Sequence, residues 1–284
     1  MYRRLSLKHG HQVASFCLLF ALLAAYGCNA VDADQPPLSL RFQPLVAGTP
    51  AQCGAPVKTP TASIQLTDLR FYVHDVRFVH SDGTETTAAL IADGRWQTES
   101  LALMDLEDGT GACENGSREM HDTLVLSGPN ASTVGIRFRI GVPFELNHDN
   151  PATNPSPLNV TAMSWGWMGG HKFMRLEAEV DGFSHLLHLA STGCEGTIGN
   201  ISRCDRGNRP EIEVNWGTER PHSLAISIDT LLGLSTEGAS ASAATDWSCM
   251  STRRDPACLS PFRALGLDVE TGTSMLPAIA FEGR

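Results

Sequence analysis

Short stretches in which apolar and polar residues alternate recur through most of the chain. Alternation with a period of two is typical of a β-strand that buries one face and wets the other. On this pattern we expect strands over residues 38–46, 63–80, 86–91, 122–127, 134–140, 173–180, 183–190, 211–216 and 223–228, with a further apolar run over 101–106. Turn-forming residues separate these segments, and no apolar pattern of helical period lasts for about twelve residues. The chain therefore predicts an all-β fold, a single antiparallel β-sandwich or barrel-like domain.

Two local features refine this prediction. In the long segment 63–80 the alternation changes parity at Thr67-Asp68 and again at His74-Asp75. Because the two faces of a strand alternate strictly, each change predicts a bulge or bend. Two short helical turns are also expected, one over residues 229–234 capped by Asp229 and one over residues 260–266 capped by Ser260.

The N-terminal segment has the pattern of an export signal. Arg3, Arg4 and Lys8 precede an apolar run over residues 13–26 that is too short and wrongly flanked to span a membrane as a helix. The run ends in Ala-Tyr-Gly-Cys28, which resembles a bacterial lipobox. We expect residues 1–28 to be a signal peptide ending at a lipidated Cys28, with plain cleavage as the alternative. A second acyl chain would be needed for firm anchoring.

That assignment sets the domain organisation and the compartment. Residues 29–37 form a short spacer, and residues 38–284 make up one β domain, since no long linker or break in composition follows. The chain should lie in the periplasm or be anchored at the outer membrane, attached to lipid only through Cys28. Removing residues 1–27 takes away three of 21 basic and none of 31 acidic residues, so the formal charge moves from −10 to −13. A chain this acidic, without a basic cluster, is a poor candidate for binding nucleic acid.

Six cysteines remain after Cys17 and Cys28 are set aside, and six in an exported chain suggest three disulfides. Spacing favours two bridges that close short loops and one that closes a long loop: Cys194–Cys204, Cys249–Cys258 and Cys53–Cys113. The competing interpretation is a cysteine metal cluster, but no Cys-x-x-Cys occurs and an oxidising compartment disfavours free thiolates. The acidic loop 107–116 could offer oxygens to calcium, although it lacks the EF-hand spacing, and a solvated disulfide loop fits it better.

The richest candidate chemistry lies between residues 143 and 194. Trp165 and Trp167 are two residues apart and, if this segment is a strand, share one face with Met163. Such residues are usually core, but crowded glycines let a partner approach closely here. Before this segment, His148 follows Asn147 in a turn-like Asn-His-Asp-Asn-Pro run, and loop residues often carry function.

Histidines also follow this segment in the sequence. His185 and His188 are three apart on an expected strand, so at most one of them faces the site, and we favour His188. Imidazole ligands suit copper and zinc.

Beyond these local arguments, the sequence resembles the MbnP-like family, the metallo-mystery-pair proteins with a four-Cys motif. The resemblance covers most of the expected mature chain. It rests on residues 69–73 with 75–77, 105–113, 141–148 and 155–159, the Trp-x-Trp at Trp165 and Trp167, the Ser-Thr-Gly-Cys at 191–194 and the Asn-Arg-Pro at 208–210.

The resemblance implies an exported copper protein that acts in copper homeostasis or acquisition. Its partner would be a MauG-like di-haem cytochrome c peroxidase that oxidises Trp165 to kynurenine, whose opened ring would bind copper beside two imidazoles. By position we assign these to His148 and His188, with Trp167 and Met163 as supporting residues. His171 stands where relatives are expected to have an aromatic residue, which makes it a further candidate ligand.

Two other classes of function are alternatives to copper binding. An enzyme is disfavoured because the chain has no His-Glu-x-x-His, no Gly-x-Ser-x-Gly, no phosphate-binding loop and no haem-attachment motif. A hydrolytic set of His148, Asp149 and Ser191 can be drawn, but nothing in the sequence fixes its geometry. The principal alternative is a metal-free surface lipoprotein that binds carbohydrate or protein through exposed aromatic residues such as Trp96 and Trp216.

Overall fold

The computed structural model describes residues 35–114, 116–166, 168–197, 199–216, 219–234, 245–275 and 277–284. The expected signal peptide, Cys28 and most of the spacer lie outside these residues, as does Trp167. In the described part of the chain no helix is long and apolar enough to cross a membrane.

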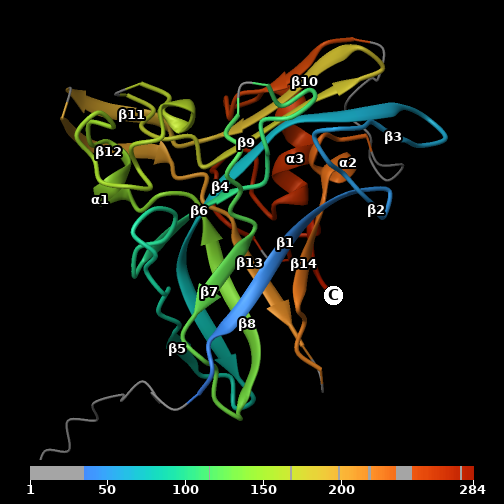
Figure 1. Ribbon diagram of the computed structural model, residues 1–284. Helices are drawn as coiled ribbons and strands as arrows, with labels where there is room; N and C mark the ends of the chain where they lie inside the picture. The colour runs from blue at the N-terminus through green and yellow to red at the C-terminus, as the bar shows by residue number, and fades with distance from the viewer. Residues whose placement is uncertain are drawn as a thin grey trace, which may run out of the picture. The chain divides into compact units, whose positions relative to one another are not determined.

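Two large sheets and one separate hairpin account for the strands (Figure 1). The first sheet has the order β16 (Phe281–Gly283), β14 (Ser223–Ser227), β1 (Leu38–Val46) and β2 (Thr49–Pro50), and β7 (Thr123–Leu126) also pairs with β1. The second sheet has the order β13 (Glu211–Asn215), β8 (Thr133–Ile140), β4 (Ser63–His80), β9 (Met174–Val180), β10 (Phe183–Leu189) and β15 (Trp247–Cys249). Three further strands pair with β4: β3 (Val57–Lys58), β5 (Glu85–Thr87) and β6 (Leu101–Asp105). The hairpin consists of β11 (Thr192–Thr197) and β12 (Asn200–Arg206).

The all-β, sandwich-like prediction is confirmed, with one difference in strand direction. Most neighbours are antiparallel, but β1 pairs with β14 and β10 pairs with β15 in parallel. The strands of each parallel pair are far apart in the sequence, and parallel pairing leaves no local turn signal. Strands β2, β3, β11, β12, β15 and β16 were not predicted; each is short or carries no clear alternation.

β4 is the longest strand and joins the two ends of the second sheet. Its pairing with β9 shifts register between Leu66 and Asp68, and its pairing with β8 shifts between His74 and Arg77. These are the two places where the sequence predicts bulges. At the second one Asp75 has φ of 50°, the left-handed conformation that a bulge uses. After each shift, the side chains of alternate β4 residues point to the opposite face of the sheet. The strand can therefore pair with different neighbours along its length.

The core between the sheets is built on an aromatic cluster. Phe42 of β1 packs edge-on against Phe71 of β4 and Phe138 of β8, with ring centroids 5.1 and 6.0 Å apart. Phe281 of β16 lies 6.3 Å from both Phe71 and Phe138, again edge-on. Edge-to-face packing places the positive ring edge on the negative face, which adds about 0.5–1.5 kcal/mol per pair to the burial of apolar area. Side chains from both sheets therefore interlock at one point.

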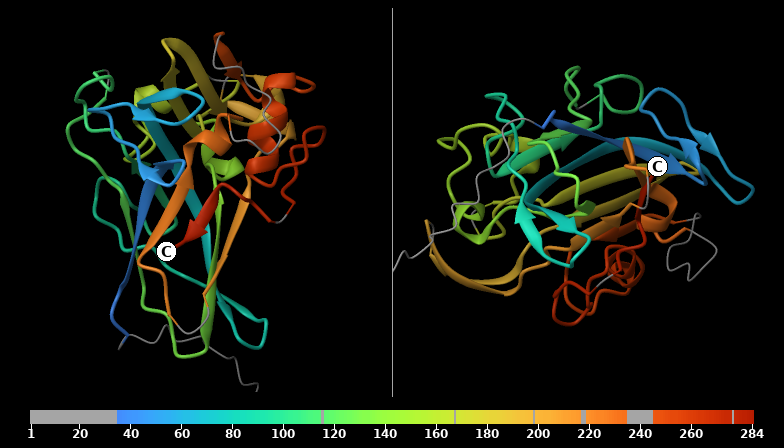
Figure 2. Two further views of the ribbon diagram at one scale, coloured as in Figure 1. Left: turned by 90° about the vertical axis from the view of Figure 1, so that its right-hand side faces the viewer. Right: turned by 90° about the horizontal axis from the view of Figure 1, so that it is seen from below.

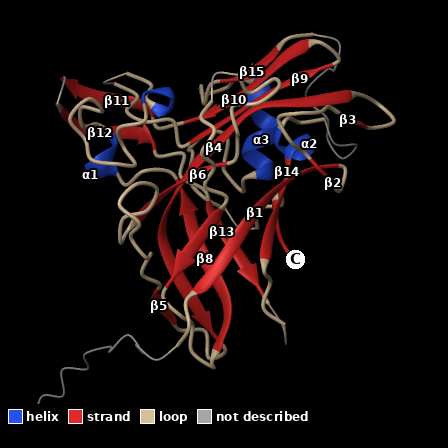
Figure 3. Ribbon diagram, in the orientation of Figure 1, coloured by secondary structure: helices blue, strands red, loops and turns tan. Residues whose placement is uncertain are grey.

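The helical segments are short, as Figure 3 shows in blue. They are α1 (Phe144–Asn147), α2 (Ile228–Leu231), α3 (Leu259–Ala264) and the 3₁₀ turns η1 (Thr161–Met163) and η2 (Pro256–Cys258). The two predicted helical turns are present as α2 and α3, but their predicted caps are wrong. Asp229 lies inside α2, where its carboxylate accepts from the backbone of Ala47 at 3.3 Å. Ser260 lies inside α3. The capping side chain in this region is that of Asp255, which precedes η2 and accepts from the N–H of Ala257.

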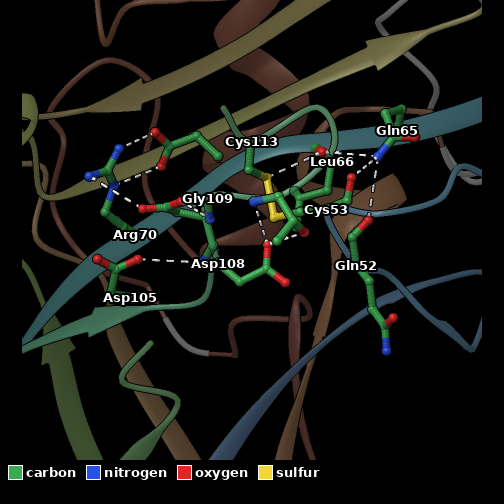
Figure 4. The surroundings of a disulfide bond; sticks show 12 residues. Gln52, Cys53, Gln65, Leu66, Arg70, Asp105, Asp108, Gly109 and Cys113 are labelled. Atoms are coloured by element: carbon green, nitrogen blue, oxygen red, sulfur yellow. Dashed lines mark hydrogen bonds and ion pairs between the residues drawn. A yellow bond between two sulfur atoms is a disulfide. The ribbon is translucent and has the colours of Figure 1, made fainter. Parts of the chain in front are cut away.

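All three predicted disulfides are present: Cys53–Cys113, Cys194–Cys204 and Cys249–Cys258. The first closes the longest loop, with a sequence separation of 60 between its cysteines, and stabilises the fold by about 4 kcal/mol in the chain-entropy picture. Beside it the Gln65 amide donates to the carbonyl of Cys53 at 2.8 Å (Figure 4).

The prediction of a solvated loop after β6 is only partly right. Glu107 has no exposed surface, and its carboxylate accepts from the backbone of Gly109 and Ser117. The buried carboxylate also faces Arg70 at 3.8 Å, so the start of this loop is part of the interior.

Candidate metal centre

Trp165 begins a tight loop that follows η1. Its backbone N–H donates to the carbonyl of Gly170 at 2.7 Å, and the N–H of Gly170 returns to the carbonyl of Gly166 at 2.8 Å. Both glycines have positive φ, 82° at Gly166 and 72° at Gly170. This segment is therefore not a strand, the condition under which Met163 and Trp165 would share one face: Met163 is fully buried at the end of η1, whereas Trp165 is half-buried in the loop.

Gly170 fastens this loop to the end of α1. A Cβ at position 170 would stand 2.2 Å from the carbonyl oxygen of Asn147, so only glycine permits this approach. Asn147 is fully buried, and its Oδ1 accepts from the N–H of His171 at 3.0 Å. The loop that carries Trp165 and the turn that carries His148 are thus locked together through one asparagine.

His188 lies beside Trp165. The two ring centroids are 5.9 Å apart and the ring planes are at 89°, an edge-to-face contact. On β10 the side chain of His188 points to the same side as Leu186, whereas His185 faces the opposite side and stacks on Trp247 at 6.0 Å. The prediction that only one of these histidines faces Trp165, and that it is His188, agrees with this geometry.

Glu177 of β9 holds the His188 ring in place. Its Oε1 lies 2.6 Å from His188 Nε2 and 2.7 Å from Arg175 Nε. Burial opposes ionisation of this carboxyl, but the hydrogen bonds from His188 and Arg175 outweigh it and lower the pKa of Glu177 to about 2. A carboxylate on one ring nitrogen fixes the tautomer and leaves the other, here Nδ1, as the atom that can bind a metal.

A line of alternating charges connects Glu177 to the interior. Arg175 reaches Asp68 at 3.2 Å, Asp68 pairs with Arg70, and Arg70 faces Glu107 at 3.8 Å. All of these side chains are at least four-fifths buried. Buried charges are tolerated only when they are paired and hydrogen-bonded, so the line fixes the direction of each member. Sequence reasoning identified neither Glu177 nor this line, because its members are spread over two strands, β4 and β9, and one loop.

His148 lies on the other side of Asn147. Since Asn147 Oδ1 is engaged by His171, its Nδ2 is the atom that faces His148, 3.2 Å from Nε2. An amide N–H₂ only donates, so Nε2 of His148 accepts and carries a lone pair. The same Nε2 lies 3.4 Å from Cys204 Sγ, and the ring packs edge-on against Phe144 at 5.5 Å.

A cavity of about 350 Å³ opens over Trp165. Its lining residues come from the Trp165 loop and from the start of β11: Trp165, Met168, Gly169, Ser191, Thr192, Gly193 and Cys194. Because Cys194 is bonded to Cys204, the disulfide against which His148 packs also lines this cavity. His188 thus contacts Trp165, and His148 packs against the disulfide whose Cys194 lines the cavity wall. Imidazole nitrogens suit copper or zinc.

The remaining candidate residues have other positions. His171 is 1% exposed, and its two ring nitrogens lie 3.0 Å from the carbonyls of Asn147 and Leu158. Its ring also packs edge-on against Tyr72. His171 thus holds the loop that bears Trp165, and a metal would have to displace one of these carbonyls.

The features behind the other functional classes are not assembled. The Ser191 hydroxyl donates to the carbonyl of Gly207 at 3.1 Å rather than to a histidine, and Asp149 is exposed. Trp216, expected on the surface, is 8% exposed and donates to the carbonyl of Thr133. It is covered because it ends β13 against β8. Trp96 is half-buried, between Arg95 and a stacked His121.

The fold and the site together define a disulfide-bonded β-sandwich protein with a cavity over a tryptophan that contacts a histidine. Comparison with known proteins specifies the class: the MbnP family model matches residues 35–251. The chain belongs to the MbnP family. Its fold is similar to the solved structure of MbnP from Methylosinus trichosporium, with a TM-score of 0.68 and 24% identity over 87% of this chain and 97% of that one. No curated protein matches the sequence.

Proposed function

We propose that this chain is an exported copper-binding protein, rather than an enzyme, and that it acts in copper homeostasis or acquisition. The ligands would be His188, His148 and Trp165 after its oxidation to kynurenine. The observation that carries the proposal is the contact between Trp165 and His188, in which Glu177 occupies Nε2 of the imidazole. Family membership and the lipobox-like Cys28 support the proposal. The compartment that we propose with it is the periplasm or the outer membrane.

The maturation step needs an oxidant, for which we propose peroxide used by a MauG-like di-haem peroxidase. Two equivalents of peroxide cleave the indole C2–C3 bond of Trp165 and insert two oxygen atoms, giving N-formylkynurenine and two waters. Hydrolysis then releases formate and leaves kynurenine. The net change is one oxygen gained and one carbon lost. The half-buried position of Trp165 in a loop, on the wall of a cavity, leaves its ring within reach of such a partner.

Unmodified tryptophan cannot bind the metal, because its indole nitrogen is only a hydrogen-bond donor. Kynurenine supplies an aromatic amine and a ketone at the same place. His188 would bind through Nδ1, since Glu177 engages Nε2, and His148 through Nε2, which already faces a donor. Copper bound there would be the cargo or signal that the protein handles, and Glu177 would keep the His188 ring in a single orientation.

The test compares two tryptophan–histidine pairs in protein co-expressed with the peroxidase. Trp165→Phe should abolish copper retention, measured by metal analysis after gel filtration, while circular dichroism stays unchanged. Trp96→Phe is the matched control, because Trp96 is also half-buried and contacts a histidine, His121. Peptide mapping of the wild type should find the change of one oxygen and one carbon on Trp165 alone. Undiminished copper in Trp165→Phe would refute the proposal.

A further inference from the structure

Three metal-ligating atoms meet at the base of the β11–β12 hairpin. Nε2 of His148 and the two Sγ atoms of Cys194 and Cys204 all lie within 4.8 Å of one another. In the structure the two sulfurs form a disulfide, so they are not thiolates. The cluster therefore becomes a candidate metal site only when the disulfide is reduced.

The imidazole is already prepared to act as a ligand. Asn147 presents its N–H₂ to Nε2 of His148, which keeps that nitrogen unprotonated and aimed toward the same side as Cys204 Sγ. Metal-bound histidine is the neutral form with a lone pair on the ligating nitrogen. A metal bound at Nε2 of His148 would replace the hydrogen bond from Asn147 to that nitrogen.

The spacing matches a small coordination shell. With metal–sulfur bonds of about 2.3 Å and metal–nitrogen bonds of about 2.0 Å, the N···S edge of a tetrahedron is about 3.5 Å. The observed distance from His148 Nε2 to Cys204 Sγ is 3.4 Å. Cys194 and Cys204 are directly paired across the hairpin with Cα atoms 3.8 Å apart, so their sulfurs stay neighbours without the covalent bond.

Access distinguishes this disulfide from the other two. Cys194 lines the cavity over Trp165 and Cys204 is half-buried. Cys53, Cys113, Cys249 and Cys258 are all at most 2% exposed. Reduction by thiol–disulfide exchange requires contact with a sulfur, so a small dithiol should reach Cys194–Cys204 first. Backbone pairs such as Thr192 with Arg206 hold the hairpin on the far side of the bridge.

We propose that Cys194, Cys204 and His148 form a redox-controlled site for a thiophilic cation, Cu(I) or Zn(II). A dithiol reductant supplies two electrons and two protons, is itself oxidised to a disulfide, and converts the bridge to two thiols. The cation then displaces both thiol protons and binds two thiolates and one imidazole. Thiolate ligands select these soft cations over Mg²⁺ and Ca²⁺. This site does not depend on oxidation of Trp165, and it shares His148 with the proposed copper centre.

The experiment uses the full chain treated with dithiothreitol under nitrogen. Alkylation and peptide mapping should find modification at Cys194 and Cys204 before the other four cysteines. Co(II) added to this form serves as the probe and should produce sulfur-to-cobalt charge-transfer absorption, absent before reduction. Competition by Zn(II), and by Cu(I) with a chromophoric chelator, then determines which cation binds more tightly.

Variants test the ligand set. His148→Gln keeps the disulfide and should weaken cobalt binding by about tenfold or more, because outer-shell partners alone are worth 10–100-fold. His188→Gln and Trp165→Phe should leave cobalt binding unchanged, which separates this site from the proposed copper centre. The proposal is overturned if another disulfide opens first, if cobalt gives no charge-transfer band with both thiols titrated, or if His148→Gln binds as well as the wild type.

Discussion

The carboxylate of Glu177 should determine both the stability of the site and its affinity for metal. Its pKa is about 2 in the folded chain against an ordinary value of 4.5, chiefly because His188 and Arg175 hydrogen-bond to the ionised form. At about 1.4 kcal/mol per pH unit, this difference corresponds to about 3 kcal/mol of folding free energy. For a carboxyl with a depressed pKa this stability is present above about pH 4.5 and is lost as the pH falls toward 2.

The perturbation is Glu177→Gln, which keeps the shape and removes the charge. Denaturant unfolding of wild type and variant from pH 7 to pH 2.5 should show a gap of about 3 kcal/mol at neutral pH that narrows steadily below pH 4.5. Glu179→Gln is the matched control, two residues along the same strand and on the same face but exposed. It should show almost no gap.

The same variant tests the role of Glu177 in holding His188. Loss of an outer-shell carboxylate typically costs 10–100-fold in metal affinity, so Glu177→Gln should bind copper that much more weakly than Glu179→Gln. A stability gap that stays constant down to pH 2.5, or equal copper affinity in the two variants, would refute the reasoning.

Two further predictions concern other parts of the chain. Burial raises the pKa of Asp105 to about 8, with Arg70 opposing the shift and Glu107 adding to it, so the folded state keeps this carboxyl protonated. Stability should fall by up to about 1.4 kcal/mol per pH unit between about pH 4 and 8, and Asp105→Asn should remove that slope in urea unfolding. Gly170→Ala would press a Cβ against Asn147, whereas Gly166→Ala has the same positive φ but open space. Calorimetry should therefore find a larger drop in Tm for Gly170→Ala, and equal drops would contradict the close approach.

Much of the fold could be predicted because its long strands bury one face. The alternation in residues 38–46 and the two parity changes in residues 63–80 result directly from which side chains are buried. The structure has β1 over the first segment and a register shift of β4 at each parity change. The short strands could not be found in this way. β3, for example, has two residues and forms by pairing with β4, which is a tertiary effect. Of the strand predicted over residues 86–91, only the start forms, as β5.

The site was predictable to the extent that it depends on strand parity. Strand parity predicted that His188 and His185 point to opposite faces of β10, and the structure places His188 against Trp165. Strand parity gave no guide to Glu177, whose importance arises from a cross-strand neighbour, or to Asn147, which hydrogen-bonds to His171, 24 residues further along the chain. Strand parity does not apply at Met163, which ends a 3₁₀ turn.

The β11–β12 hairpin belongs to neither large sheet, and Figures 1 and 2 show it at the margin of the fold. Its ends are joined by Cys194–Cys204, so the residues between them form a closed cassette. The length, charge or sequence of this closed segment can change, in evolution or by design, with little effect on the core. The outer part of the hairpin can therefore differ between relatives while the two sheets and the residues that line the cavity stay the same.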